Sequence, residues 1–180
     1  MIKNRLLLTT WLITVMILSA CSPSRERMEK KIIAEEKRLF DSEKGFSKAG
    51  VDSLVVLYLD FAETYPSDSL APEYLFKAST MKMNMGNGED AIRLYEQFMQ
   101  DYPGHQKAPL CLFFVGYVQE NVLGNLGKAK EVYLEFIGKY PDHDFADDAR
   151  IAIENLGKTP EQMIREFEEK HKADSLAEKH

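Results

Sequence analysis

Cysteine and tryptophan are scarce in this sequence of 180 residues, which contains two cysteines and one tryptophan. Two cysteines are too few for the disulfide framework that stabilises many small secreted domains. Cys111 lies in the apolar stretch PLCLFFV, where a free cysteine is usually a small buried hydrophobic residue. We therefore expect Cys111 to take part in packing and not in nucleophilic chemistry.

Positive charge is also in short supply. The chain carries 23 basic and 29 acidic residues and has a formal net charge of -6. Nucleic-acid binding requires clustered Lys and Arg side chains that displace counterions from phosphates, and we find no basic stripe of this kind in the sequence. These features argue against a nucleic-acid partner.

Sequence motifs for catalysis or cofactor binding are absent as well. The sequence contains no glycine-rich phosphate loop, paired-cysteine motif, His-Glu-x-x-His sequence or nucleophile elbow. His105 and His143 occupy equivalent places, each two residues after a proline, but metal ligands must converge to within about 2 Å of one ion. We interpret both histidines as solvated loop residues, and we expect no metal, no cofactor and no enzymatic activity.

The one long apolar run is at the amino terminus. Lys3 and Arg5 precede an apolar stretch from Leu6 to Leu18, which is shorter than the roughly 20 residues that a transmembrane helix needs. A positive start, a short apolar core and small residues after it are typical of a signal peptide. The sequence therefore predicts a signal peptide over residues 1–20.

This segment ends in Leu-Ser-Ala-Cys at positions 18–21, which resembles the bacterial lipobox that lipoprotein signal peptidase recognises. The resemblance implies that the thiol of Cys21 receives a diacylglyceryl group, that cleavage occurs before it, and that its new amino group is acylated, for example with palmitate. Residues 21–26 would then form a lipidated tether. The alternative is an ordinary secretory signal in which the cysteine occurs by chance. Ser22, by resemblance to known sorting signals, favours the outer membrane, with the protein facing the periplasm.

The rest of the chain contains an internal repeat. LYLDFAETYP ends at Pro66, LYEQFMQDYP at Pro103 and VYLEFIGKYP at Pro141, so the period is 37 and then 38 residues. The aligned residues are Tyr58, Tyr95 and Tyr133; Phe61, Phe98 and Phe136; Tyr65, Tyr102 and Tyr140; and Ala71, Ala108 and Ala146. The aromatic residues fall at i, i+3 and i+7, which predicts one amphipathic helix in each repeat.

Turn and cap residues separate these helices. A proline after each aligned tyrosine predicts a helix end, and three residues further on Ser69 and Asp144 can cap the next helix, with Gln106 a poorer candidate. Within each pair we expect left-handed glycines in the turn, namely Gly86, Gly88, Gly124 and Gly127. After each turn a small residue, Ala91 or Ala129, allows the helices to cross closely.

The two ends of the repeats have their own patterns. We expect an opening helix that covers the first face of the repeats, with an apolar stripe of Met28, Ile32, Ile33, Leu39 and Phe40. At the other end Gly157 closes a helix, and Thr159 to Gln162 fits a capping box with proline at the first helical position. The last helix has apolar Met163, Ile164 and Phe167, so we expect it to shield the end of the stack before it frays.

Ala91, Tyr95, Phe98 and Pro103 follow the small residue, aromatic, apolar and proline pattern of the tetratricopeptide repeat, and the resemblance covers most of residues 50–157. It implies an all-α fold, a right-handed helix-turn-helix solenoid of about eight helices. We predict a repeat domain over 27–157, with units at 27–66, 70–103 and 107–141 and a half unit at 144–157, followed by a capping helix and frayed tail over 159–180.

Tetratricopeptide proteins bind segments of other proteins in a concave face lined by the first helix of each pair. Carrying the family's groove positions over to this chain predicts a groove formed by Phe76, Thr80, Met83, Phe113, Tyr117 and Glu120. For each of these six, packing between helices is an equally good interpretation.

The resulting hypothesis is a membrane-anchored, non-catalytic adaptor that binds another protein of the bacterial cell envelope. The chain resembles the lipoprotein of the barrel-assembly machinery and the periplasmic coordinator of cell division only through the shared repeats. Two alternatives stay open: an enzyme or accessory subunit of cell-wall processing, and a self-assembling structural lipoprotein.

Overall fold

The computed structural model describes residues 24–41 and 47–177, and for the last helix the side chains of residues 160–169 and 172. The predicted signal peptide and Cys21 therefore lie outside the described residues. Within the described ranges there are eight α-helices and no β-strand, so the all-α, tetratricopeptide-like solenoid fold is confirmed. None of the described helices combines the length and the apolar character that a membrane span requires.

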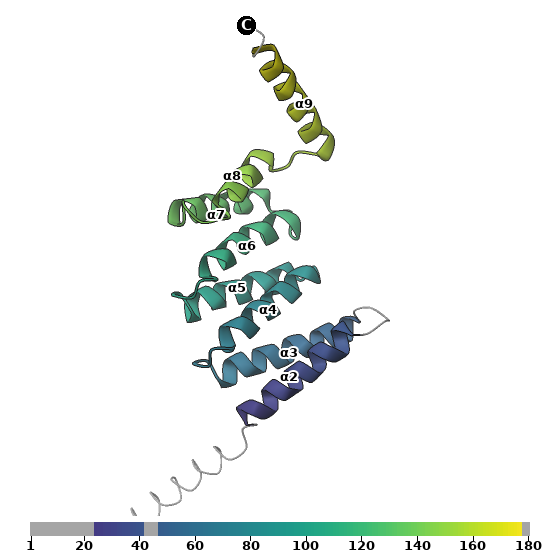
Figure 1. Ribbon diagram of the computed structural model, residues 1–180, viewed down its shortest axis with the longest axis vertical. Helices are drawn as coiled ribbons and strands as arrows, with labels where there is room; N and C mark the ends of the chain where they lie inside the picture. The colour runs from purple at the N-terminus through teal and green to yellow at the C-terminus, as the bar shows by residue number, and fades with distance from the viewer. Residues whose placement is uncertain (1–23, 42–46, 178–180) are drawn as a thin grey trace, which may run out of the picture. The chain divides into compact units, whose positions relative to one another are not determined.

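The chain divides into two compact units, one up to Ala71 and one from Pro72 onward. In the first unit α2 (Arg25–Phe40) and α3 (Lys48–Thr64) pack side by side (Figure 1). Ser47 caps α3, because its Oγ accepts a hydrogen bond of 3.1 Å from the amide of Gly50. Gly50 lies close to α2: a Cβ added there would be 2.9 Å from Cδ1 of Leu39.

The apolar stripe of α2 is narrower than we expected. Met28, Ile32 and Leu39 are buried, whereas Ile33 and Phe40 are 53% and 55% exposed. The first three recur at spacings of four and seven residues and so lie on one side of the helix, while Ile33 and Phe40 each follow a buried residue and are rotated by about 100° from it. The predicted apolar stripe is therefore buried along one edge, at Met28, Ile32 and Leu39, and exposed along the other, at Ile33 and Phe40.

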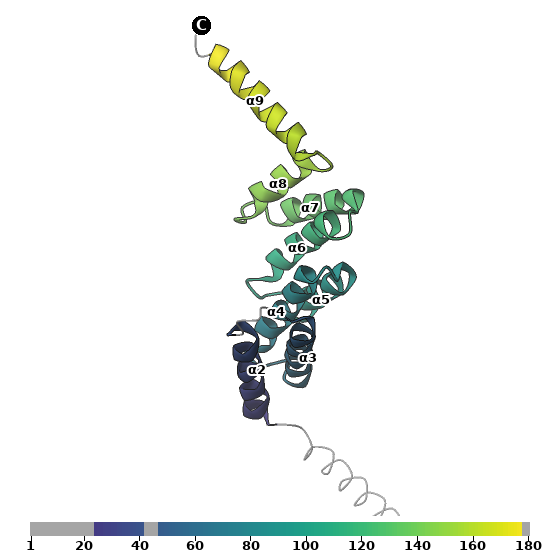
Figure 2. The same cartoon turned by 90° about the vertical axis from the view of Figure 1, so that its right-hand side faces the viewer.

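The second unit contains six helices. They are α4 (Ala71–Asn84), α5 (Gly88–Asp101), α6 (Ala108–Asn121), α7 (Leu126–Lys139), α8 (Ala146–Asn155) and α9 (Pro160–Ala177). Helices that follow one another in the chain pack together from α5 to α8, as both views of the ribbon show (Figures 1 and 2). The aligned repeat positions form the core: Tyr95, Phe98, Tyr133 and Phe136 are at most 1% exposed.

Each aligned tyrosine-proline pair ends a helix as predicted. Tyr65, Tyr102 and Tyr140 leave the helical region at φ near −130° and ψ near 55 to 60°, outside the α region that a following proline disfavours. In each loop the third residue after the tyrosine makes two backbone hydrogen bonds. Its amide donates to the carbonyl of the tyrosine, and its own carbonyl accepts from the amide of the alanine that starts the next helix. These residues are Asp68, His105 and His143. The first helix of every following pair thus starts from the same double turn.

The turns inside the pairs match the prediction at two glycines out of four. Gly86 and Gly124 adopt φ of 76° and 67°, whereas Gly88 and Gly127 do not have positive φ. The small size of Gly88 matters for a different reason, because a Cβ there would lie 2.7 Å from Cδ2 of Leu123. The predicted close crossings at Ala91 and Ala129 agree with their complete burial.

The last helix starts as expected but does not cover the end of the repeats. Gly157 adopts φ of 75° after α8, and the capping box is confirmed: the Thr159 amide donates to Gln162 Oε1 at 2.8 Å, and the Gln162 amide donates to Thr159 Oγ1 at 3.3 Å. Beyond this point α9 leads away from α8 (Figures 1 and 2). Met163, Ile164 and Phe167 are 39%, 58% and 65% exposed, so the described structure does not contain the expected cap.

Candidate functional site

The six predicted groove residues lie on the first helices of two successive pairs, α4 and α6. Phe76 is half-buried, and its ring centroid lies 6.0 Å from that of Tyr95 and 6.1 Å from those of Phe98 and Phe114. The ammonium group of Lys107 lies 4.9 Å from the same ring. Phe76 on α4 therefore packs against both α5 and α6, and only part of its ring is accessible to a binding partner.

Thr80 and Met83 contact the hydroxyl group of Tyr95, which is otherwise enclosed by the core. The Thr80 and Tyr95 hydroxyl oxygens are 3.2 Å apart, and the Tyr95 hydroxyl donates to the sulfur of Met83 at 3.9 Å. Burial raises the pKa of Tyr95 well above its ordinary value, so this tyrosine is neutral and acts as a structural donor. Thr80 and Met83 thus both contact the second helix of their own pair, α5.

The three groove positions on α6 differ from one another: Phe113 is in the core, Glu120 accepts a hydrogen bond, and Tyr117 is exposed. Phe113 is 7% exposed, and its ring packs 5.6 Å from Tyr133 and 4.9 Å from Phe145. Glu120 accepts a hydrogen bond of 2.8 Å from the Tyr133 hydroxyl. Tyr117 is 39% exposed, with its ring edge toward Phe114. Of the six predicted groove residues, Tyr117 is therefore the one most open to a partner.

The surface formed by the first helices α4 and α6, which we call the first-helix surface, also has a charged border that the sequence did not indicate. Glu73 in the first turn of α4 forms an ion pair with Lys107, and His105 Nε2 lies 3.8 Å from the other Glu73 oxygen. These residues are about 30 positions apart in sequence, and no repeat pattern aligns them. Together with Phe76 they form a rim of mixed charge beside the aromatic rings.

The two histidines have a structural role that the solvated interpretation missed. His105 Nδ1 accepts from the Lys107 amide and His143 Nδ1 from the Phe145 amide, both at 3.2 Å. Each ring also packs against a core phenylalanine, with centroids 5.3 and 5.4 Å apart. Asp68 fills the same loop position in the first unit, where its carboxylate accepts from the Leu70 amide at 2.9 Å.

These contacts correct the predicted helix caps. The side chains that accept from the loop amides belong to Asp68, His105 and His143, each one residue before the predicted caps Ser69, Gln106 and Asp144. The equivalent positions of the two histidines in the repeats were the signal in the sequence that could have indicated this role.

In the part of the chain that the structure describes, no group of three or more His, Cys, Asp or Glu residues could hold a metal ion.

Cys111 lies on the core side of α6 and has the packing role expected of it. Its side chain is fully buried, and this burial raises the pKa of the thiol to about 12. A thiol with such a pKa is protonated at neutral pH and is a poor nucleophile.

A hollow of about 320 Å³ lies in the second unit, among the ends of α5, α6 and α7. Met99, Leu112 and Tyr140 supply apolar walls, and the Glu135 and Lys139 side chains, joined by an ion pair of 2.7 Å, are at its edge. This lining suits an apolar side chain of a protein better than a charged substrate.

Stacked helix pairs with a repeated aromatic core define the class of helical repeat proteins. Within this class, residues 73–105 and 112–143 match the tetratricopeptide repeat, and the two matches span α4 to α5 and most of α6 to α7. No curated protein gives a significant match to the chain. The matched repeats support a general role in protein–protein interaction, and proteins built from them are typically scaffolds and not enzymes.

Proposed function

We propose that this protein is a lipid-anchored adaptor of the bacterial cell envelope that holds a segment of another protein against the first-helix surface of α4 and α6. The observation that carries the proposal is the pair of successive tetratricopeptide matches, in which Tyr117 stays exposed beside the half-buried ring of Phe114. Exposed tyrosine is enriched in protein interfaces because its ring offers apolar area and its hydroxyl a hydrogen bond.

The anchoring part of the proposal depends on the amino terminus. The positive start, the short apolar core and the Leu-Ser-Ala-Cys sequence at 18–21 support cleavage before Cys21 and lipidation of its thiol. Several acyl chains, at about 0.8 kcal/mol for each buried methylene, would hold the helical repeats at a membrane. The outer membrane, on its periplasmic side, is the location that Ser22 favours.

The adaptor proposal can be tested by crosslinking in cells followed by mass spectrometry of the purified protein. Tyr117→Glu places a charge in the proposed contact, and circular dichroism checks that the helices stay folded, because the Tyr117 ring also contacts Phe114. Leu134→Glu is a matched control, since Leu134 is 53% exposed on the second helix α7. One dominant partner that is lost with Tyr117→Glu and kept with Leu134→Glu is the expected result.

Two other results would contradict the proposal. If both substitutions, or neither, change the captured protein, the binding surface does not lie on the first helices. If mass spectrometry finds Cys21 unmodified and the chain cut at a different residue, the lipid anchor is wrong whatever the partner.

A further inference from the structure

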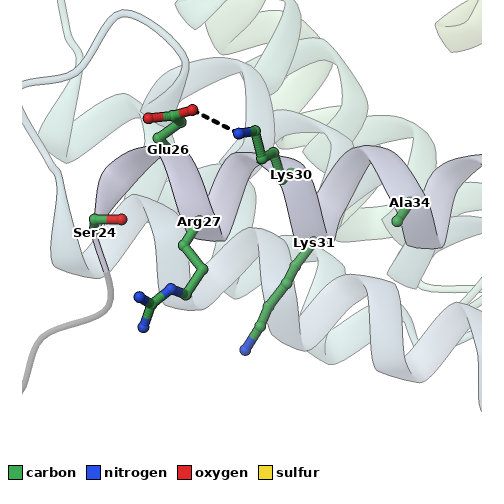
Figure 3. Close-up of a pocket in the computed structure, with 6 residues that line it drawn as sticks. All are labelled: Ser24, Glu26, Arg27, Lys30, Lys31 and Ala34. Carbon is green, nitrogen blue, oxygen red and sulfur yellow. Dashed lines mark hydrogen bonds and ion pairs between the residues drawn. The ribbon is translucent and has the colours of Figure 1, made fainter.

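Helix α2 differs in charge from the rest of this acidic chain. Its sixteen residues include six basic and four acidic side chains, whereas the whole chain has a net charge of -6. Figure 3 shows Arg27 and Lys31 extending to the same side of the helix, whereas the paired Lys30 and Glu26 lie on another side of it. The absence of a basic stripe that we inferred from the sequence does not hold locally for α2.

The acidic residues of α2 are all occupied by contacts within the first unit. The pairs are Glu26 with Lys30, Glu29 with Arg25, Glu35 with Arg38, and Glu36 with the Tyr58 hydroxyl. Arg25 in addition donates to Asp68 at 2.7 Å. Beyond these pairs, α2 exposes three more cations, Arg27, Lys31 and Lys37, so its outer surface carries an excess of positive charge.

The arrangement of α2 is that of a helix with a buried side and a positively charged outer side. Met28, Ile32 and Leu39 are the buried residues of α2, and at 100° per residue Lys30, Ala34 and Lys37 lie on the opposite side. Arg27 and Lys31 lie on one flank of this outer side, about 120° and 80° from the mean direction of the buried residues, and extend together there. Ile33, 53% exposed, stands at the edge of this outer side. Lys and Arg side chains next to an exposed apolar side chain are the composition that binds anionic membrane surfaces.

The position of α2 in the chain brings it close to the proposed anchor. Only three residues lie between Cys21 and Arg25, where α2 begins, so four steps along the chain join them. A fully extended chain covers about 3.5 Å per residue, so the start of α2 can be no more than about 14 Å from the lipidated residue. Electrostatic attraction to the membrane decays over a Debye length of about 8 Å at physiological salt.

We propose that the outer side of α2 lies against anionic phospholipid headgroups, with Arg27, Lys31 and Lys37 as the contacting cations. This inference rests on the lipid anchor under Proposed function and adds to it a second, electrostatic contact. The lipid supplies attachment to any bilayer, whereas α2 contacts the surface only where the headgroups are negatively charged. Such a contact holds the first unit of the protein at the membrane surface.

The test uses the lipidated full-length product, purified from cells and reconstituted into vesicles of phosphatidylcholine alone or of phosphatidylcholine with phosphatidylglycerol. An environment-sensitive fluorophore is attached in an Ala34→Cys variant, because Ala34 is exposed on the outer side of α2. Cys111 does not compete for the label, since it is buried and its thiol pKa is raised to about 12. Flotation of the protein with neutral vesicles is measured in the same samples.

The expected result is flotation with both vesicles, but a blue shift and headgroup-quencher sensitivity of the label only with phosphatidylglycerol. Arg27→Gln and Lys31→Gln should each reduce the ratio of surface-bound to free α2 by roughly fivefold, and together by roughly thirtyfold. The matched control is Lys128→Gln with Lys130→Gln, which removes the same charge from exposed positions on α7 and should leave the label response unchanged.

The outcomes separate the two proposals. Failure to float with neutral vesicles shows that the lipid anchor is wrong and removes the basis of this inference. Normal flotation with no phosphatidylglycerol-dependent response overturns the α2 contact and leaves the anchor standing. An equal effect of the α7 control pair also overturns it, because overall charge would then explain the response.

Discussion

Replacing Gly116 in α6 by alanine should destabilise the protein although alanine favours helices. A Cβ at position 116 would lie 2.7 and 2.8 Å from Cε1 and Cδ1 of Tyr133, closer than carbon atoms can approach. The Tyr133 ring cannot easily yield, because it is 1% exposed, packs against Phe113 and donates its hydroxyl to Glu120.

The magnitude follows from two opposing effects. Alanine in place of glycine inside a helix stabilises by about 1 kcal/mol, while overpacking a core costs about 1–3 kcal/mol. Losing the Tyr133 to Glu120 hydrogen bond as the ring shifts would cost a further ~1 kcal/mol. We therefore expect Gly116→Ala to lower the free energy of unfolding by about 1–3 kcal/mol.

A matched variant gives the opposite sign. Gly138, near the end of α7, has no atom within 4 Å of an added Cβ, so Gly138→Ala should stabilise by up to about 1 kcal/mol. Urea unfolding is best followed by circular dichroism, because the only tryptophan, Trp11, lies in the predicted signal peptide. If Gly116→Ala proves as stable as Gly138→Ala, the close contact with Tyr133 does not exist as described.

Three further predictions follow from buried or bonded polar groups. Tyr133→Phe should lower the free energy of unfolding by about 1 kcal/mol, measured by urea titration, because Glu120 loses its donor; no change would show that the bond contributes nothing. The Cys111 thiol, with its pKa raised to about 12, should react with a chromogenic disulfide reagent at neutral pH only after denaturation, and rapid reaction of the native protein would disprove its burial. The hydrogen bond from Arg25 holds the pKa of Asp68 below its ordinary value, so its stabilisation is fully present above the unfolded pKa of about 3.9 and is lost as pH falls through the lower folded pKa. Thermal unfolding from pH 7 to pH 2 should therefore show a deficit for Asp68→Asn that disappears in acid, and a deficit that persists there would exclude this cause.

The helices of the repeats could be predicted because their signals are local. Tyr95, Phe98 and Tyr102 recur at helical spacing, and Pro103 blocks further extension, so neither feature depends on distant residues. The capping box at Thr159 and Gln162 was predictable for the same reason. The repeat helices and the capping box are each determined by side chains that lie close together in the sequence.

The exposure of individual groove residues could not be predicted in this way. Phe76, Phe113 and Ile151 hold the same repeat position, yet Phe113 is 7% and Ile151 56% exposed. The difference arises because α7 packs against Phe113, whereas α9 leads away from α8. Helical spacing identifies the side of a helix but not which neighbour is present to cover it.

The loop contacts of the histidines show a similar limit. Equivalent positions in two repeats indicated a shared role for His105 and His143, but the role depends on the amide two residues later and on a phenylalanine in the preceding helix. Asp68 performs the same hydrogen bonding with a different side chain. The repeat alignment reveals the position, and the three-dimensional structure is needed to reveal what the position does.

The packing of α5 on α6, α6 on α7 and α7 on α8 has a consequence for how this protein folds. Contacts between elements that are adjacent in sequence require little loop closure before they form, so such a topology folds rapidly. Stability then depends on each helix and its immediate neighbours, and unfolding can start at one end and proceed helix by helix. Backbone amides of α6 and α7, which each have a neighbour on both sides, should therefore exchange hydrogen more slowly than those of α9.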